Sequence, residues 1–275
     1  GYTQLQRISH RVIEEPDGSK TVLVAEIEPV RMMKWETAIT LRPGRLYVET
    51  RGRLSSIAPY PVPFASSQNA AMHATDEMEM IYPSNSHVTG HGKRRAHIWP
   101  IAKDGVDESW FKNLKHGLSY FVDGRGLLED YWGCYSHDPE IDAGTVIVAD
   151  HRTAPGKKYF SWGSHPHGRS WDTHLSDEDG PYVELQVQAF WDNLGYGYAW
   201  LNPFEAKEFT VYWYPIIALG GFVKAVRDVC LNAKPTDDGN LRVAIQATRD
   251  IDGAQIRVRD GDGVVFETAT DLARA

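Results

Sequence analysis

A strand-like stretch in the middle of the chain, GPYVELQVQAFWDN at residues 180–193, carries side chains that could do chemistry. Tyr182, Glu184 and Gln186 alternate with valine and leucine, which is the period of a β-strand with one dry face and one polar face. A carboxylate on a strand is aimed rigidly and can serve as a general acid or base. A solvated strand glutamate has the same pattern, so alternation alone does not assign Glu184 to a site.

Further polar side chains cluster in loops of the middle third of the chain. Histidines and carboxylates in such loops could transfer protons, and arginines and lysines could hold hydroxyls or a uronate carboxylate. The candidates are Asn69, His73, Asp76 and Glu77; His87, His91, Lys93, Arg94 and His97; His137 and Asp138; Asp150 and His151; and Trp162, His165, His167, Arg169, Trp171 and Asp172.

Several kinds of site are disfavoured by the motifs that the sequence lacks. Structural zinc prefers cysteine ligands at short spacing, and the proline within HPH at 165–167 constrains the aim of its two imidazoles. No GxSxG elbow, P-loop or complete dinucleotide fingerprint occurs. We therefore expect no cofactor, and Ca²⁺ held by loop carboxylates is the alternative that we leave open.

The aromatic content, 9 Trp, 13 Tyr and 9 Phe, suits a protein that binds sugars. Sugars present apolar C–H faces and many hydroxyls, so aromatic platforms and planar polar side chains hold them. Large β-sandwiches also use aromatic residues in their cores, and composition does not separate the two uses. The candidate platforms are Trp162, Trp171 and Trp191, with Arg169, Gln186 and Asn69 as candidate hydrogen-bonding residues.

Carboxylates combined with sugar-binding aromatics favour two chemistries. A glycoside hydrolase needs an acid and a base or nucleophile across the scissile bond. A mutarotase needs an acid and a base that move a proton between O1 and O5 of a sugar. Glu184 suits either role, and Asp150, His151, His137 and Asp76 are the candidate partners.

The elements that must position these residues are strands. Strand-like segments occur at 20–30, 35–56, 157–163, 181–190 and 208–216, and 144–151 is a continuous apolar strand. The segment 35–56 is predicted as a β-hairpin around a Pro-Gly turn. The pattern predicts an all-β fold. The segment 221–233 has helix-like apolar spacing but could equally be an irregular strand.

The character of the chain changes near residue 220. Tryptophan does not recur after Trp213, and short alternating strands joined by Gly-Asp turns follow. We predict one domain over 1–219, truncated at its N-terminus, and a partial second β-domain over 220–275. We expect this chain to be a piece of a longer protein, so other domains of that protein are expected partners.

Charge and cysteine content limit the remaining partners. A net charge of -8 disfavours nucleic acid and anionic membranes, and no apolar run is long enough to span a bilayer. Cys134 and Cys230 are predicted to be free, buried thiols. The sequence leaves the cellular compartment open.

Three segments carry a resemblance to a known family. These are CYSHDPEIDAGTVIVADHRTAPGKKYFSWG, LSDEDGPYVELQVQAFWDN and WLNPFEAKEFTVYWYPI, supported by QNAAMHATDEMEMIYP nearer the N-terminus. They resemble the bacterial DUF5107 family, over roughly residues 10–216. The resemblance implies a galactose mutarotase-like β-supersandwich, followed by the start of a small β-sandwich-like domain.

A more distant resemblance concerns Glu184. Aldose 1-epimerases carry a strand of the form L-E-T-Q followed by a turn and a closing strand, and VELQ at 183–186 with the strand at 209–216 is similar in order and spacing. This resemblance implies that Glu184 is a catalytic base. The epimerase histidine would fall near Asn69–His73, so His73 is the implied partner, while His137 or His151 could stand for a second histidine.

Together these observations predict a carbohydrate-active domain. The main hypothesis is a glycoside hydrolase that acts on an oligo- or polysaccharide, with Glu184 as general acid or base. The alternatives are an aldose 1-epimerase-like enzyme and a non-catalytic carbohydrate-binding module of a larger enzyme.

Overall fold

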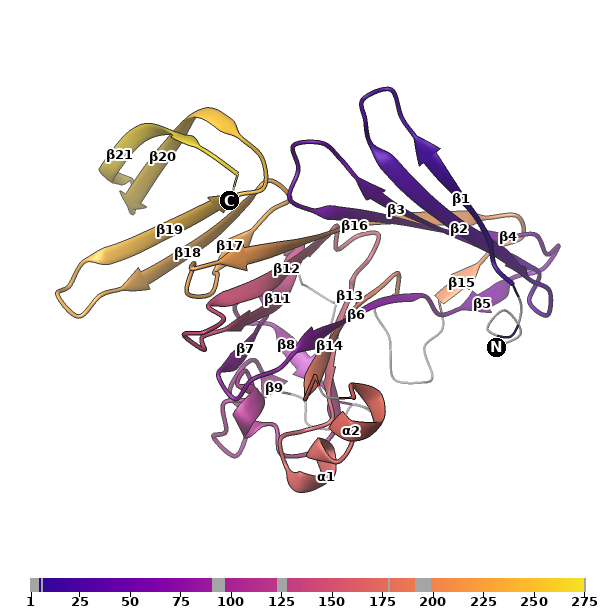
Figure 1. Ribbon diagram of the computed structural model, residues 1–275, viewed down its shortest axis with the longest axis horizontal. Helices are drawn as coiled ribbons and strands as arrows, with labels where there is room; N and C mark the ends of the chain where they lie inside the picture. The colour runs from indigo at the N-terminus through magenta and orange to yellow at the C-terminus, as the bar shows by residue number, and fades with distance from the viewer. Residues whose placement is uncertain are drawn as a thin grey trace.

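The computed structural model describes residue 5 and residues 7–90, 97–122, 128–177, 179–190 and 199–274. Its largest element is an antiparallel eight-stranded sheet, in the order β1-β2-β3-β4-β16-β12-β11-β7 (Figure 1). The long strand β16 joins the N-terminal strands to the middle of the chain, because it pairs with β4 on one side and β12 on the other. The strands are β1 Ser9–Glu14, β2 Lys20–Glu28, β3 Met33–Leu41, β4 Val48–Ser56, β7 Met78–Ile81, β11 Tyr131–Ser136, β12 Ala143–Ala149 and β16 Ala206–Ile217.

A second sheet has six strands in the order β6-β14-β13-β10-β8-β9. β14 lies between β6 and β13, so both neighbours contribute side chains to its polar face. Its strands are β6 Ser67–His73, β8 His87–Thr89, β9 His97–Ile98, β10 Leu118–Val122, β13 Gly156–Ser161 and β14 Tyr182–Gln188. The short strands β5 Val62–Phe64 and β15 Ala199–Leu201 pair separately.

The main hydrophobic core lies between these two sheets. Val183, Leu185 and Val187 of β14 are fully buried and belong to one cluster with Trp132 and Ile147 of the eight-stranded sheet. The predicted dry face of the 180–193 stretch is therefore confirmed. Because side chains alternate along a strand, the burial of these three residues turns Glu184 to the other face of the sheet.

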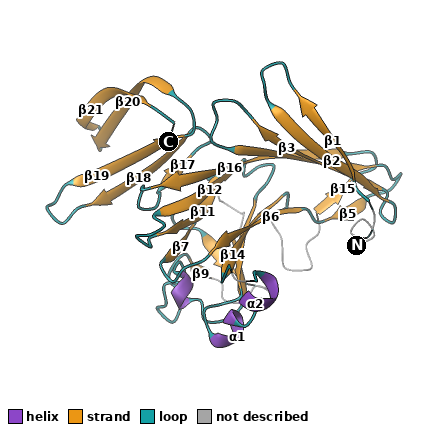
Figure 2. Ribbon diagram, in the orientation of Figure 1, coloured by secondary structure: helices purple, strands orange, loops and turns teal. Residues whose placement is uncertain are grey.

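Most of the described chain is strand, which confirms the predicted all-β class (Figure 2). The hairpin predicted at 35–56 is confirmed as β3 and β4, which pair from Met33↔Ser56 to Leu41↔Val48. The ambiguous segment at 221–233 is extended and holds β17 Lys224–Ala225 and most of β18 Val229–Pro235. Its apolar spacing reflects burial against the large sheet.

The C-terminal strands β17 and β18 pack on the outer face of the large sheet. β17, β18 and β19 Leu241–Ala247 form a three-stranded sheet, and β20 Ile251–Asp260 pairs with β21 Gly263–Leu272. Phe222 and Cys230 share a second core with Tyr135 and Tyr214 of the large sheet. The domain boundary at 219/220 stays a prediction, since this core crosses it.

In the described part of the chain, helical structure is confined to short pieces, η3 Phe111–Asn113, α1 Pro166–Arg169 and α2 Asp172–Leu175. Among the described residues, no helix has the length and apolar character needed to cross a bilayer. Cys134 and Cys230 are free and buried, as predicted. Burial raises the pKa of each thiol to about 12.

Candidate active site

Glu184 lies on the polar face of the six-stranded sheet, held by two neutral amides. Asn69 Nδ2 of β6 donates a hydrogen bond to Glu184 Oε2 at 2.9 Å, and Gln186 Nε2 donates to the same oxygen at 2.8 Å. The register explains the contacts, because Gln186 is opposite Asn69 and Glu184 is opposite Ala71. Both bonds go to Oε2, and no described residue hydrogen-bonds to Oε1. The carboxylate is therefore oriented while one oxygen remains available.

A lysine that sequence reasoning missed extends this network. Lys158 of β13 donates from Nζ to Gln186 Oε1 at 3.1 Å. Since an ammonium can only donate, this bond fixes the Gln186 amide with its nitrogen towards Glu184. Burial lowers the pKa of Lys158, and the nearby Glu184 carboxylate opposes part of that shift. Lys158 is adjacent in sequence to another lysine, so the sequence does not distinguish it. The network spans three strands, and only the pairing of those strands shows that Lys158 reaches Gln186.

Glu184 lines an open hollow of about 770 Å³. One wall is β6, with Asn69, Ala71 and His73, and the floor is Tyr182 and Glu184. The rest of the lining is Leu175, the last residue of α2, and the loop that follows it, with Ser176, Asp179, Gly180 and Pro181. The sequence-predicted residues Glu184, Asn69 and His73 thus meet in one place, and Gln186 joins them through its hydrogen bond.

The two described tryptophan candidates lie at the Tyr182 end of this face. Trp162 and Trp171 stack on each other, with ring centroids 4.6 Å apart, and Trp162 Nε1 donates to the Tyr182 hydroxyl at 3.0 Å. One face of each indole is therefore covered by the other indole. The hydrogen bond from Trp162 orients the Tyr182 hydroxyl. Trp191 lies outside the described residues, as does Lys93.

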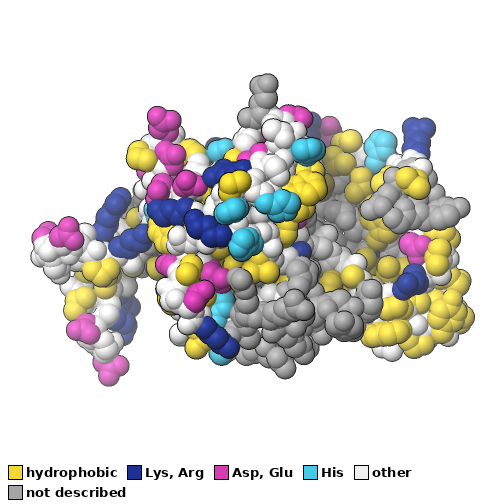
Figure 3. All heavy atoms as spheres, turned by 90° about the horizontal axis from the view of Figure 1, so that it is seen from below, with side chains coloured by type: hydrophobic (Ala, Val, Ile, Leu, Met, Phe, Trp, Pro, Cys, Tyr) yellow, Lys and Arg dark blue, Asp and Glu magenta, His cyan; other side chains and the backbone are white. Residues whose placement is uncertain are grey.

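Other candidates lie away from the hollow. His137 Nε2 is 2.8 Å from Glu79 Oε2 at the far side of the large sheet, and Arg169 pairs with Asp76 at 2.9 Å. Asp150 accepts two hydrogen bonds from the Arg152 guanidinium. His151, like these residues, is absent from the lining of the Glu184 hollow. Figure 3 shows the lower face of the molecule, where histidine, lysine and arginine side chains gather.

One group of side chains could coordinate a cation. Candidate ligand atoms of Asp130, Asp150 and His151 lie within 4.8 Å of one another. Their oxygens already have partners: His151 Nδ1 is 2.7 Å from Asp130 Oδ1, and Arg152 binds Asp150. The buried ammonium of Lys157 lies in the same electrostatic environment. The Arg152 guanidinium and the Lys157 ammonium already offset the charge of the carboxylates, so we assign no metal there.

Asp179 is the second acidic residue that lines the hollow, and the sequence analysis did not single it out. It belongs to the LSDEDG turn at 175–180, whose charges have the pattern of an ordinary solvated loop. Gly180 follows it with φ +78° and turns the chain into β14, which brings this loop over the polar face. The only sequence signal was proximity to the strand that carries Glu184.

The arrangement suits proton transfer to or from a polar ligand. Glu184 offers an oriented acceptor oxygen, while His73 and Asp179 offer titratable groups in the same hollow. Tyr182, Asn69 and Ser176 add hydroxyl and amide groups able to bind hydroxyls. The geometry therefore provides a candidate acid/base centre with many neutral hydrogen-bonding groups around it.

Solved structures share this architecture. The chain is similar to a TPR-domain containing protein from Parabacteroides distasonis, with a TM-score of 0.67 and 21% identity over 87% of this chain and 39% of that one. It is also similar to a putative aldose 1-epimerase from Klebsiella pneumoniae, with a TM-score of 0.55 and 12% identity over 78% of this chain and 55% of that one. It therefore spans less than two thirds of the length of either protein.

A galactose mutarotase-like protein from Clostridium acetobutylicum matches with a TM-score of 0.53 and 11% identity, over 79% of this chain and 68% of that one. At these identities the likeness concerns the fold, which is galactose mutarotase-like. The sequence match is more specific, because a family model covers residues 3–216. The chain therefore belongs to the family described as Domain of unknown function (DUF5107).

Proposed function

We propose that this chain binds a sugar in the Glu184 hollow and transfers a proton at it, with Glu184 as the general base or acid. The observation that carries the proposal is the oriented carboxylate: two amides hold Oε2, and Oε1 has no hydrogen-bond partner among the described residues. A carboxylate held by hydrogen bonds from two adjacent strands loses little freedom when a substrate arrives. The fold shared with a putative aldose 1-epimerase supports a sugar as that substrate.

Epimerisation of an aldose is the reaction that the hollow favours. It requires a base that removes the proton from O1 and an acid that donates a proton to the ring oxygen O5, so that the C1–O5 bond opens. Glu184 supplies the base, and His73, on the adjacent strand, supplies the acid. The polar lining from Tyr182, Asn69 and Ser176 suits the hydroxyls of the sugar.

Glycoside hydrolysis is the second candidate, favoured by Asp179. This reaction needs two carboxyl groups on opposite sides of the scissile bond. Glu184 on the strand and Asp179 on the loop that precedes this strand line the same hollow. In this reading one carboxyl group protonates the leaving oxygen, and the other acts as base or nucleophile.

Two assays separate the reactions. Mutarotation is followed as the change in optical rotation of freshly dissolved α-glucose or α-galactose, and hydrolysis as the release of reducing ends from an oligosaccharide panel. Glu184→Gln should lower the active rate by about 10²–10⁴-fold, the usual contribution of a positioned acid or base. His73→Gln should abolish only mutarotation, and Asp179→Asn only hydrolysis.

Glu140→Gln is the matched control, since Glu140 is exposed and far from the hollow in sequence and sheet order. Its rate should equal that of the unmodified chain. A Glu184→Gln variant with undiminished activity would refute the assignment of Glu184. A chain that is inactive in both assays but gains thermal stability with a glycan would instead support the binding-module alternative.

A further inference from the structure

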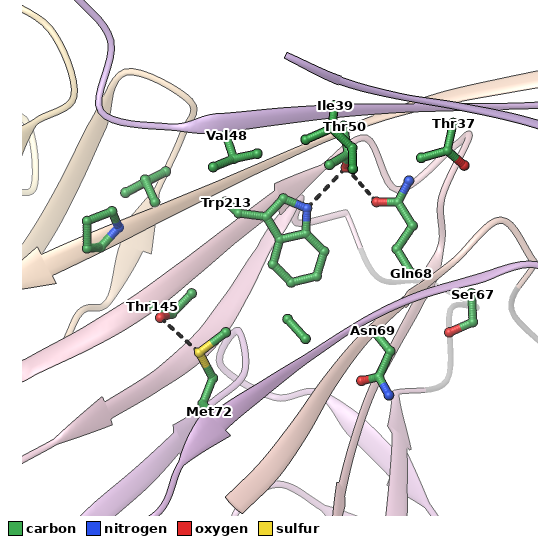
Figure 4. A pocket seen from close by; sticks show the side chains of 13 residues that line it. Thr37, Ile39, Val48, Thr50, Ser67, Gln68, Asn69, Met72, Thr145 and Trp213 are labelled. Carbon is green, nitrogen blue, oxygen red and sulfur yellow. Dashed lines mark hydrogen bonds between the residues drawn. The ribbon is translucent and has the colours of Figure 1, made fainter. Parts of the chain in front are cut away.

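A second cavity, of about 600 Å³, lies between β6 and the inner face of the large sheet (Figure 4). The large sheet lines it with residues of β3, β4, β12 and β16, and β6 lines it with Ser67, Gln68, Asn69, Ala70 and Met72. The lining includes Thr37, Ile39, Thr50, Gln68, Met72 and Trp213. We call this cavity the Trp213 groove.

The Trp213 ring is held in place by a chain of hydrogen bonds. Its Nε1 donates to Thr50 Oγ1 at 3.1 Å, and Thr50 Oγ1 donates to Gln68 Oε1 at 2.5 Å. In Figure 4 the indole points into the space between β6 and the large sheet. Gln68 Nε2 is buried and has no hydrogen-bond partner in the described part of the chain. The groove therefore presents an aromatic ring that its hydrogen bonds hold in one orientation.

The groove and the Glu184 hollow lie on either side of one strand. Asn69 lines both cavities. Among the described strands, β6 is the edge of its sheet and pairs with β14 alone. Because side chains alternate along a strand, Gln68 and Met72 face the groove, while Asn69 and His73 face the hollow.

The open edge of β6 also carries free backbone groups. The ladder bonds Ala74 N→Pro181 O and Ala189 N→Ser66 O flank β6, so residues 66, 68, 70, 72 and 74 direct their backbone groups towards β14. The intervening residues Ser67, Asn69, Ala71 and His73 direct theirs away from β14. Described residues supply no backbone hydrogen bond to these four. Donors and acceptors thus line the edge between the two cavities.

We infer that the Trp213 groove is a second sugar subsite, and that the ligand is an oligosaccharide or polysaccharide chain that crosses the edge of β6. This inference rests on the proposed function of the Glu184 hollow. One sugar residue lies beside Glu184, and a neighbouring residue lies against the Trp213 indole. The apolar C–H face of that sugar packs on the ring.

The test compares how tightly the 275-residue protein binds single sugars and oligosaccharides of the same sugar. The probes are glucose with the maltose-to-maltohexaose and cellobiose-to-cellohexaose series, and galactose with β-1,4-galactobiose. Binding is measured by isothermal titration calorimetry. The oligosaccharide that binds should have an affinity about tenfold higher than its monosaccharide, which is the scale of one aromatic contact.

Two variants assign this gain to the groove. Trp213→Ala removes the ring. Ile39→Arg fills the groove from a residue that is 41% exposed, so this change leaves the core intact. Both variants should lower the affinity for the oligosaccharide to that for the monosaccharide, and leave the affinity for the monosaccharide unchanged. Ile27→Arg is the matched control, since Ile27 is 47% exposed on the opposite face of the same sheet.

The outcomes separate the two proposals. A monosaccharide that binds as tightly as its chains would overturn the subsite and leave the Glu184 hollow standing. The same conclusion follows if Ile39→Arg leaves the chain affinity unchanged, or if Ile27→Arg weakens it as much as Ile39→Arg does. Failure of every sugar and every chain to bind would overturn the proposed function, and the subsite with it.

Discussion

Replacing Lys157 with methionine should stabilise the protein at neutral pH. Lys157 of β13 is fully buried, opposite Val187 on the core-facing side of the sheet. Its Nζ has no hydrogen-bond partner in the described part of the chain. Burial lowers the pKa of Lys157 from 10.5 to about 8, against the opposing attraction of the Asp130, Asp150 and Glu129 carboxylates. The charged side chain therefore costs free energy in the folded state.

The size and the pH dependence of this destabilisation follow from the lowered pKa of Lys157. A pKa near 8 instead of 10.5 corresponds to about 3 kcal/mol of destabilisation when both states are protonated, as at pH 7. Between these two pKa values the unfolded chain binds more protons than the folded chain, so stability rises with pH across that window. The advantage of Lys157→Met should be full below pH 8 and vanish near pH 10.5.

Urea denaturation at a series of pH values from 7 to 10.5 measures this directly. The difference in unfolding free energy between Lys157→Met and the unmodified protein isolates Lys157 from groups that titrate in both. Lys103→Met is the control, because Lys103 is exposed and its removal should leave stability unchanged. If Lys157→Met destabilised the protein at pH 7, or if its advantage did not shrink with pH, the buried ammonium would be a net stabilising partner of the carboxylates and the reasoning would fail.

Two further predictions concern packing. A Cβ on Gly133 would lie 2.0 Å from the Thr145 carbonyl oxygen, so Gly133→Ala should destabilise the sheet by several kcal/mol or prevent folding, while Gly263→Ala, with its nearest atom at 3.4 Å, should change thermal stability little. Equal melting temperatures for the two variants would contradict this. Cys134 and Cys230 are buried, with pKa values near 12, so a thiol reagent should modify them only as fast as the protein unfolds. Rapid modification of the native protein would show that these thiols are accessible.

Strand positions could be predicted from the sequence because burial follows a period of two on each strand. The hairpin at β3 and β4 and the dry face of β14 follow from local alternation and turn residues. The segment at 221–233 could not be resolved locally. Its apolar residues are buried by contact with Tyr135 and Tyr214, which lie far away in the sequence. The spacing of apolar residues within a short segment does not identify the distant residues that bury it.

The site shows the same division. The sequence by itself determined that Glu184 lies on the polar side of a strand, and family resemblance made it and His73 the main candidates. Tertiary structure decided which side chains surround that carboxylate. Strand register placed Asn69 and Lys158 beside β14, and the turn at Gly180 brought Asp179 over it, whereas His137, His151 and Asp150 went to other parts of the fold. Register between strands depends on long-range pairing, which local sequence patterns do not encode.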